Sequence, residues 1–365
     1  MKIIKHGIVY RVTEGPFRYQ AWPTVCVDEK GVLYAACSGH RLGHICPFGK
    51  NLFFTSTDGG ETWSVPSVAT DTWFDDRDAG LTYLGNGKIL LQYFHNDINR
   101  YLTEWREQII NETDPRYREM IVGALETYTR FTPEMNSAGA FVKLSEDYGR
   151  TWGEPVKVPI TSPHGPVKTV SGRLLLAGRE FYSGAPEEDK FGIFVYESFD
   201  EGKSWEKLSK IDFPEGCGPT NIFEPHIIEL KDGKIIAAIR GDRDPVFEKF
   251  SIFFAESLDG GKTFSKPWAT ELHGAPPHLY LLPDGAVLVS FGSRRDKPFG
   301  IRAAISRDGC KTFEKEMILT ESYSSDLGYP ATTMLPDGTF ITVYYQRYCP
   351  EDGNKTSIMY TKWEL

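Results

Sequence analysis

SLDGGKTF, from Ser257 to Phe264, is one of five copies of the pattern Ser-x-Asp-x-Gly-x-Ser/Thr-aromatic. The others are STDGGETW at 56–63, SEDYGRTW at 145–152, SFDEGKSW at 198–205 and SRDGCKTF at 306–313. The aspartate can accept backbone N–H bonds, the glycine can take positive φ, and the aromatic ring can pack between sheets. We interpret these segments as structural turns. Cys310 replaces the glycine in the last copy, so we expect that turn to be strained or differently shaped.

A second repeat is an apolar strand that turns on a glycine into another apolar strand. It occurs six times, with the glycine at Gly31, Gly87, Gly172, Gly233, Gly285 and Gly338. Repetition at intervals of roughly 50 to 60 residues is typical of propellers. The apolar runs are short, rich in β-branched and aromatic residues, and bounded by Gly, Pro or Asp, which predicts four-stranded antiparallel sheets. The sequence therefore predicts an all-β, six-bladed β-propeller that occupies residues 1–365 as a single domain.

The last repeat lacks its fourth strand. The chain ends soon after SIMYTKW, residues 357–363, which reads as the third strand of that blade. The N-terminal segment KIIKHGIVYRV, residues 2–12, also reads as a strand and precedes the first blade. Pairing it beside residues 357–363 would close the ring and remove two open sheet edges.

Blade two contains an insertion. The interval from turn glycine to box aspartate is 23 to 28 residues in blades one, three, four and five, but 60 residues in blade two. The extra residues, about 96–135, are polar with helical apolar spacing, and Thr113-Asp114-Pro115 resembles a helix start. We expect two short helices on the same face as the candidate site. They would be a surface decoration, an oligomer contact or a lid over that site.

Composition limits the possible partners. The net charge of -9 argues against nucleic acid, so any anionic ligand needs a local arginine cluster. No stretch is apolar enough for a signal peptide or a membrane span, so we expect a cytoplasmic protein if Met1 is the native start. The six cysteines show no metal-site spacing, and we expect reduced thiols. The sequence does not indicate an oligomeric state.

Ionisable residues recur where the inner strands begin. Nine residues before the turn glycines stand Trp22, Asp78, Pro163, Glu224, Pro276 and Tyr329. Burying such groups costs several kcal/mol unless they are paired or hydrated. Arginines recur after the second strands, at Arg179, Arg240, Arg294 and Arg347. We expect a carboxylate, a phenol and several guanidinium groups to face one pocket, although Asp78 alone is equally consistent with a structural role.

Two histidines follow the ring positions at the same interval. His226 and His278 each stand two residues after the ring position of their blade. A metal site would need a third ligand, and none is evident in the sequence. We therefore favour a structural role for both histidines.

The two longest motifs resemble the sialidase (neuraminidase) superfamily. They are EPHIIELKDGKIIAAIR at 224–240 and LGYPATTMLPDGTF at 327–340, together with the aspartate boxes and the six-blade count. In that family a tyrosine is the nucleophile and a glutamate takes its proton, roles that the resemblance implies for Tyr329 and Glu224. A neutral phenol can approach an anomeric carbon that bears a carboxylate, where an anionic nucleophile would be repelled.

The family holds the sugar carboxylate with three arginines. Arg240 matches the second, Arg294 or Arg295 could supply the third, and Asp78 resembles the aspartate that contacts ring substituents. Ala21 stands where the family has its first arginine, and Arg18, Arg41 and Arg77 are candidates to replace it. Further candidate substrate-binding residues are Arg179 and His164.

The family's acid/base aspartate has no counterpart here. The corresponding stretch, SGHRLGHICPFGKNLFF at 38–54, contains no carboxylate. His40 and His44 lie in it, and either could transfer protons near neutral pH.

The favoured interpretation is a sialidase-like exo-acting glycoside hydrolase on terminal acidic sugars, retaining through Tyr329 and needing no cofactor. One alternative is a propeller polysaccharide lyase on uronates, with Tyr329 or a histidine as base. The other is a glycan-binding propeller without turnover. Reaction products separate the three, because a lyase forms an unsaturated sugar, a hydrolase releases free sugar, and a binder does neither.

Overall fold

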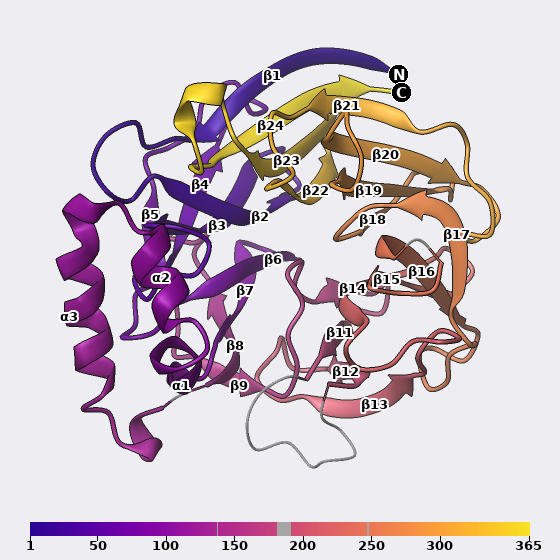
Figure 1. Ribbon diagram of the computed structural model, residues 1–365. Coiled ribbons are helices and arrows are strands. Elements are labelled where there is room, and N and C mark those ends of the chain that lie inside the picture. The colour runs from indigo at the N-terminus through magenta and orange to yellow at the C-terminus, as the bar shows by residue number, and fades with distance from the viewer. Residues whose placement is uncertain (137, 181–190, 247) are drawn as a thin grey trace.

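The chain forms a ring of six four-stranded antiparallel sheets, as predicted (Figure 1). The computed structural model describes residues 1–136, 138–180, 191–246 and 248–365. Blade one contains β2 (Tyr19–Val27), β3 (Leu33–Arg41), β4 (Lys50–Ser56) and β5 (Ser67–Thr70); blade two contains β6 (Arg77–Gly85), β7 (Lys88–His95), β8 (Gly139–Ser145) and β9 (Val156–Val158). Blade three contains β10 (Val167–Lys168), β11 (Leu174–Arg179), β12 (Ile193–Ser198) and β13 (Glu206–Ile211).

The other three blades follow the same order. Blade four contains β14 (Ile222–Glu229), β15 (Ile235–Asp242), β16 (Lys249–Ser257) and β17 (Trp268–His273); blade five contains β18 (His278–Leu281), β19 (Val287–Ser293), β20 (Gly300–Ser306) and β21 (Met317–Glu321). Blade six contains β22 (Gly328–Met334), β23 (Phe340–Gln346), β24 (Ser357–Glu364) and, outermost, β1 (Lys2–Tyr10).

The two termini close the ring. β1 pairs antiparallel with β24, from Lys2 opposite Glu364 to Tyr10 opposite Ile358. This pairing confirms the predicted closure, and the two chain ends lie side by side in Figure 1. It covers the edge of β24 that would otherwise be open to another chain.

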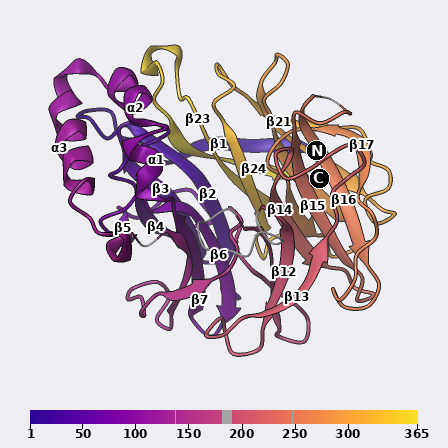
Figure 2. The same cartoon turned by 60° about the horizontal axis from the view of Figure 1, so that its bottom comes forward.

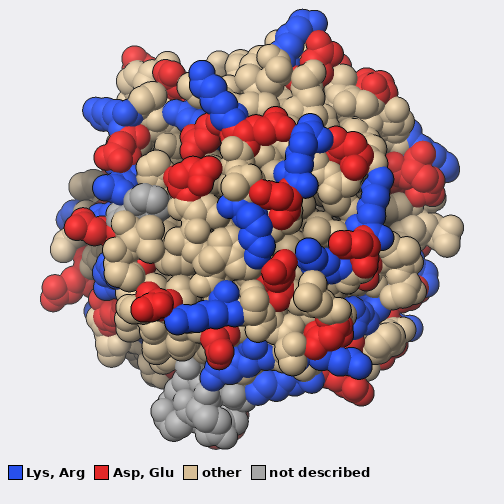
Figure 3. Space-filling view, turned by 90° about the vertical axis from the view of Figure 1, so that its right-hand side faces the viewer, with Lys and Arg blue, Asp and Glu red and all other residues tan. Residues whose placement is uncertain are grey.

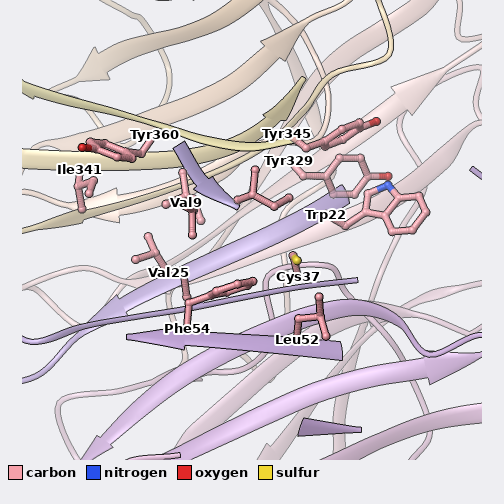
Figure 4. Packing of buried hydrophobic residues seen from close by; sticks show 14 of the residues in the cluster. Val9, Trp22, Val25, Cys37, Leu52, Phe54, Tyr329, Ile341, Tyr345 and Tyr360 are labelled. Atoms are coloured by element: carbon pink, nitrogen blue, oxygen red, sulfur yellow. The ribbon is translucent and has the colours of Figure 1, made fainter. Parts of the chain in front are cut away.

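Six separate hydrophobic clusters lie between consecutive blades. Figure 4 shows the one between blades six and one, where Trp22, Tyr329 and Tyr345 gather at one end. Inward side chains of one sheet pack against those of the next, so the blades stabilise each other around the ring. On the face shown in Figure 3, acidic and basic side chains are interspersed.

The box turns have the predicted structure. Asp58 accepts hydrogen bonds from the backbone N–H and hydroxyl of Thr62. Cys310 adopts φ 66°, and its N–H donates to Ser306 Oγ at 2.8 Å, as the glycine of the other boxes does. The turn keeps the shape of the other boxes, and the left-handed backbone of Cys310 carries the strain that was one of the two expected outcomes.

The insertion in blade two forms three α-helices rather than two. They are α1 (Ile98–Leu102), α2 (Arg106–Glu112) and α3 (Arg118–Tyr128), with 3-10 turns at η1 (Pro115–Tyr117) and η2 (Pro133–Met135). Asp114 caps η1, as the sequence indicated. The helices lie at one side of the ring beside blade one (Figure 2), where their apolar residues pack against Leu42, Cys46 and Phe74. A third 3-10 turn, η3 (Pro350–Asp352), precedes β24, and no helix in the described ranges is long and apolar enough to cross a bilayer.

Three histidines pack together in the central channel. The ring centroids of His164, His226 and His278 are 4.6 to 5.1 Å apart, so His164 is the third ring that sequence reasoning did not join to the other two. Nδ1 of His226 accepts the Leu279 N–H, and Nδ1 of His278 accepts the Thr332 N–H. Their Nε2 atoms therefore carry the hydrogen and offer a metal no lone pair. Among the described residues, no group of three or more His, Cys, Asp or Glu side chains has metal-site geometry.

We expect the histidine cluster to make the fold labile to acid. Burial lowers the pKa of all three imidazoles, that of His278 to about 3 from an ordinary value of 6.5. Below pH 6.5 the unfolded chain binds more protons than the folded one, so stability falls by about 1.4 kcal/mol per pH unit for each histidine. The urea midpoint should drop between pH 7.5 and 5. In His164→Leu, which keeps both backbone bonds, the drop should be smaller, and an unchanged pH slope would contradict this account.

Candidate active site

Four inner strands contain, within their first four residues, a residue in the left-handed backbone region. They are Trp22 (φ 54°), Asp78 (φ 53°), Glu224 (φ 44°) and Tyr329 (φ 51°), and strand pairing is interrupted at each one. Such a β-bulge redirects the side chain. The conformation costs about 1–3 kcal/mol per residue and persists only where the surroundings hold it. Proline follows three of the four and has no N–H to lose from the ladder.

All six blades contribute to a pocket of about 690 Å³ at this end of the channel. Its lining is His44, Arg77, Asp78, Phe94, Arg100, Glu104, Thr161, Pro163, Arg179, Phe191, Phe223, Glu224, Arg240, Arg294 and Tyr329. Five arginines face three carboxyl groups, in a chain whose net charge is -9. The pocket is therefore a local positive site on an acidic protein, which favours an anionic ligand.

Tyr329, Glu224 and Arg240 form one hydrogen-bonded chain. The Tyr329 hydroxyl donates to Glu224 Oε1, and Arg240 Nη1 donates to Glu224 Oε2 at 2.6 Å. Burial and the negative charge of Glu224 raise the pKa of Tyr329 well above 10, so the phenol keeps its proton at rest. The carboxylate is placed to accept that proton when the oxygen attacks an electrophile, the geometry of an activated nucleophile.

Asp78 has an unusual pKa for a carboxyl group. Burial, opposed by Arg77 and reinforced by Glu224, raises it from 3.8 to about 7. Oδ1 of Asp78 has no hydrogen-bond partner among the described residues. A buried carboxyl without a full set of partners, in a cleft beside a candidate nucleophile, is typical of functional sites.

One wall of the pocket alternates phenylalanine with arginine. The Arg179 guanidinium lies 4.2 Å from the Phe223 ring centroid, and Arg240 lies 5.8 Å from Phe223 and 5.4 Å from Phe250. The Arg294 guanidinium lies 5.1 Å from the Phe250 ring centroid. Ring faces hold guanidinium groups without neutralising them. Arg294 Nε donates to the Ser325 carbonyl at 3.1 Å, and its terminal nitrogens have no hydrogen-bond partner in the described part of the chain.

A buried ion-pair layer supports the opposite wall. Asp75 is fully buried and accepts from Arg41, from Arg77 at 3.3 Å and from the Tyr101 hydroxyl at 2.8 Å. Although burial opposes the change, the charges of Arg41 and Arg77 lower the pKa of Asp75. The Trp22 ring lies 4.7 Å from the Arg41 guanidinium and 4.0 Å from that of Arg77. Tyr101 belongs to α1, so the helical insertion is bonded to this layer.

The insertion also forms part of the pocket rim. Arg100 and Glu104 line the pocket, which confirms that the helices stand on the same face as the site. They form an ion pair at 2.9 Å, and the Arg100 guanidinium stacks 4.0 Å from the Trp105 ring centroid. The insertion therefore contributes side chains to the pocket wall.

The pocket contains eight of the residues that the sequence nominated. These are Tyr329, Glu224, His44, Asp78, Arg77, Arg179, Arg240 and Arg294. Arg179 is held by the Ile222 carbonyl at 2.8 Å, and burial lowers its pKa to about 10.

The other nominated residues, Arg347 among them, lie outside the pocket lining. Arg41 is wholly buried against Asp75, and Arg295 turns to Asp296 at 3.3 Å. His40 stacks on Phe17 and lines a separate pocket of about 390 Å³ beside α3. His164 lines a pocket of about 430 Å³ together with His226 and His278. Arg18, the other candidate for the missing arginine, pairs with Asp352 at 3.0 Å.

Sequence reasoning missed the aromatic and supporting residues. Phe223 directly precedes Glu224, so the strand register could have placed it beside the pocket. Phe191, Phe250 and Asp75 lie outside any repeated position, and the sequence contains no signal for them.

Comparison with known proteins agrees with the fold. A family model described as "BNR repeat-like domain" matches residues 116–342, and one described as "BNR/Asp-box repeat" matches residues 54–65. The chain belongs to the BNR repeat-like family. No curated protein matches the sequence.

Solved structures share the sialidase-like propeller. A protein of unknown function from Dyadobacter fermentans is 22% identical, with TM-score 0.77, over 100% of this chain and 99% of that one. The intramolecular trans-sialidase from Ruminococcus gnavus is 16% identical, with TM-score 0.61, over 96% and 95%. The NanB sialidase from Streptococcus pneumoniae is 14% identical, with TM-score 0.66, over 98% and 70%. At these identities the likeness concerns the fold.

The two aspartates of the site should respond oppositely to removal of charge. Because the pKa of folded Asp78 is raised to about 7, the folded state loses stability as pH rises from 3.8 through 7. Asp78→Asn should therefore raise the urea midpoint at pH 8 more than at pH 5. Asp75→Asn, the matched control, should lower the midpoint at pH 8, because it leaves Arg41 buried without its partner. Destabilisation by Asp78→Asn at pH 8 would contradict the assigned environment.

Proposed function

We propose that this protein is an exo-acting glycoside hydrolase that removes terminal acidic sugars, with sialic acid or a related sugar as substrate. The observation that carries the proposal is the Tyr329–Glu224–Arg240 chain inside a pocket with five arginines. The sialidase-like fold supports it as analogy.

The arginine wall supports recognition of a carboxylate. Arg240 and Arg294 stand at adjacent positions of the phenylalanine–arginine wall, and the terminal nitrogens of Arg294 are available to a ligand. Guanidinium groups bind carboxylates through paired hydrogen bonds in a fixed plane. Arg77, beside Trp22, and Arg179 supply further positive charge. Asp78 still holds a proton in a fraction of molecules at neutral pH and is suited to bond sugar oxygens.

In the first step the Tyr329 oxygen attacks the anomeric carbon, its proton passes to Glu224, and the bond to the leaving group breaks. Activated aryl leaving groups depart without protonation, so this step needs only the Tyr329–Glu224 pair. In the second step water displaces Tyr329 and loses a proton to a base, and the sugar retains its configuration. His44 is the histidine of the blade-one loop that lines the pocket, and we assign it this proton transfer.

The first test is turnover of aryl glycosides of acidic and neutral sugars. Tyr329→Phe should reduce kcat/KM on an acidic substrate by on the order of 10³-fold or more, as loss of a nucleophile does. Tyr344→Phe is the matched control, since this buried tyrosine of the neighbouring strand bonds Thr361 outside the pocket. Near-normal turnover by Tyr329→Phe would remove it from the nucleophile role, and an unsaturated product would indicate a lyase.

A second test concerns charge recognition. Arg294→Gln should raise KM for an acidic aryl glycoside about 10- to 100-fold, since a charge-assisted hydrogen bond contributes about 1.5–3 kcal/mol. The neutral analogue should be little affected. Arg295→Gln is the matched control, because that side chain pairs with Asp296. Equal losses on both substrates would argue against carboxylate recognition by Arg294.

A further inference from the structure

His44 is fixed in place at the pocket wall. Its carbonyl accepts hydrogen bonds from Arg41 Nη2 at 2.9 Å and from Arg77 Nη1 at 3.1 Å. Its ring stands at 90° to the Trp22 ring, with the centroids 5.1 Å apart. Both the backbone and the imidazole are therefore held, although the loop between β3 and β4 has no regular structure.

A chain of hydrogen bonds leads away from the His44 ring. Nδ1 of His44 lies 2.9 Å from the Tyr19 hydroxyl oxygen. That oxygen lies 2.9 Å from Oδ2 and 3.1 Å from Oδ1 of Asp326. The Tyr345 hydroxyl donates to Oδ1 of the same carboxylate at 2.9 Å. Tyr19 and Tyr345 are buried, so neither hydroxyl has bulk water as a competing partner.

The number of hydrogens available decides which atom donates in each of these hydrogen bonds. A carboxylate has no hydrogen to give, so the Tyr19 hydroxyl hydrogen must lie toward Asp326. The Tyr19 oxygen can then only accept from His44, and the hydrogen of the imidazole must sit on Nδ1. The opposite tautomer would leave lone pairs facing each other at 2.9 Å. The direct separation of His44 Nδ1 from Asp326 Oδ1 is 4.0 Å, which favours the same placement.

We propose that Asp326 and Tyr19 are positioning residues that hold His44 as the Nδ1–H tautomer, leaving the Nε2 lone pair as a base in the pocket. Nothing in the sequence joins these three residues, since Tyr19 and His44 belong to blade one and Asp326 directly precedes β22 of blade six. The arrangement has the logic of a catalytic triad, in which a carboxylate selects the tautomer of a histidine, here with a phenol inserted between them.

The surroundings of His44 keep the ring neutral. Partial desolvation of the ring, whose side chain remains 47% exposed, and the positive charges of Arg77, Arg41, Arg294 and Arg240 lower its pKa below 6.5. Burial, Tyr345 and Asp326 raise the pKa of Tyr19 well above 10, so the phenol keeps its hydrogen. A neutral imidazole with a free Nε2 can accept a proton at neutral pH.

For catalysis the inference rests on the proposed function. Nε2 of His44 takes a proton from water while the water oxygen bonds the anomeric carbon. The bond from that carbon to the Tyr329 oxygen breaks, and Glu224 returns its proton to Tyr329. The imidazolium then loses its proton to solvent. His44 replaces the carboxylate that the blade-one loop lacks.

The tautomer can be measured without any substrate. In full-length protein labelled with ¹⁵N-histidine at neutral pH, the His44 signals are assigned by their loss in His44→Gln. We expect a pyrrole-type Nδ1 and a pyridine-type Nε2. A pyrrole-type Nε2 in the wild-type protein would overturn the proposal by itself, because the tautomer is read on the wild-type protein and the variant serves only for assignment.

Tyr19→Phe and Tyr345→Phe form a matched pair. Each removes one phenol hydroxyl from Asp326, but only Tyr19 contacts His44. In Tyr19→Phe, His44 should lose its preference for the Nδ1–H tautomer and become a mixture or the Nε2–H form. In Tyr345→Phe, His44 should keep the Nδ1–H form. An unchanged His44 spectrum in folded Tyr19→Phe would contradict the positioning role.

Kinetics separates this inference from the proposed function. On an aryl substrate, Tyr19→Phe should keep the initial burst of phenol release and lose at least about tenfold in steady turnover, because only the water step needs the base. Equal loss of burst and turnover would contradict a role confined to the base. If the spectrum shows Nδ1–H at His44 but the protein turns over no acidic glycoside, the proposed function is overturned and the tautomer assignment stands.

Discussion

The site depends on a backbone constraint repeated around the ring. In four of the six inner strands a non-glycine residue adopts the left-handed conformation and interrupts the pairing with the next strand. Each such bulge costs stability, and packing between adjacent blades offsets the cost. Because the blades are arranged radially, these redirected side chains meet at one end of the channel. The nucleophile candidate Tyr329 and its partner Glu224, 105 residues apart in sequence, thereby share a hydrogen bond.

Buried charged residues beneath the pocket wall hold the charged side chains of the site in place. Arg41 and Asp75 form a fully buried pair that anchors Arg77, the His44 backbone and the helical insertion through Tyr101. On the other wall, phenylalanine rings support arginines without neutralising them. Removing one member of a buried pair leaves an uncompensated charge, so this layer fixes the geometry while the pocket residues remain available to a ligand. The raised pKa of Asp78 means that ionising this carboxyl group in the desolvated site costs free energy.

The repeats predicted the blade count, the closure by β1 and the face that carries the insertion, because turn chemistry and strand period are local properties. Register along the inner strands also placed Glu224, Tyr329 and Asp78, and the second strands placed Arg240. It did not reveal that His226 and His278 pack with His164, because the sequence does not show which side chains meet across the channel. Loops were harder still: His40 and His44 are four residues apart, yet only His44 lines the main pocket. Their orientations depend on packing against Phe17 and Trp22, which no local pattern encodes.

The most direct measurement is a crystal structure with a hydrolysis-resistant thioglycoside of an acidic sugar bound. We predict that the sugar carboxylate lies within hydrogen-bonding distance of Arg240 and Arg294, with the anomeric carbon facing the Tyr329 oxygen and Glu224 behind it. A ligand bound in the histidine-lined pocket instead, or one whose carboxylate points away from both arginines, would contradict it.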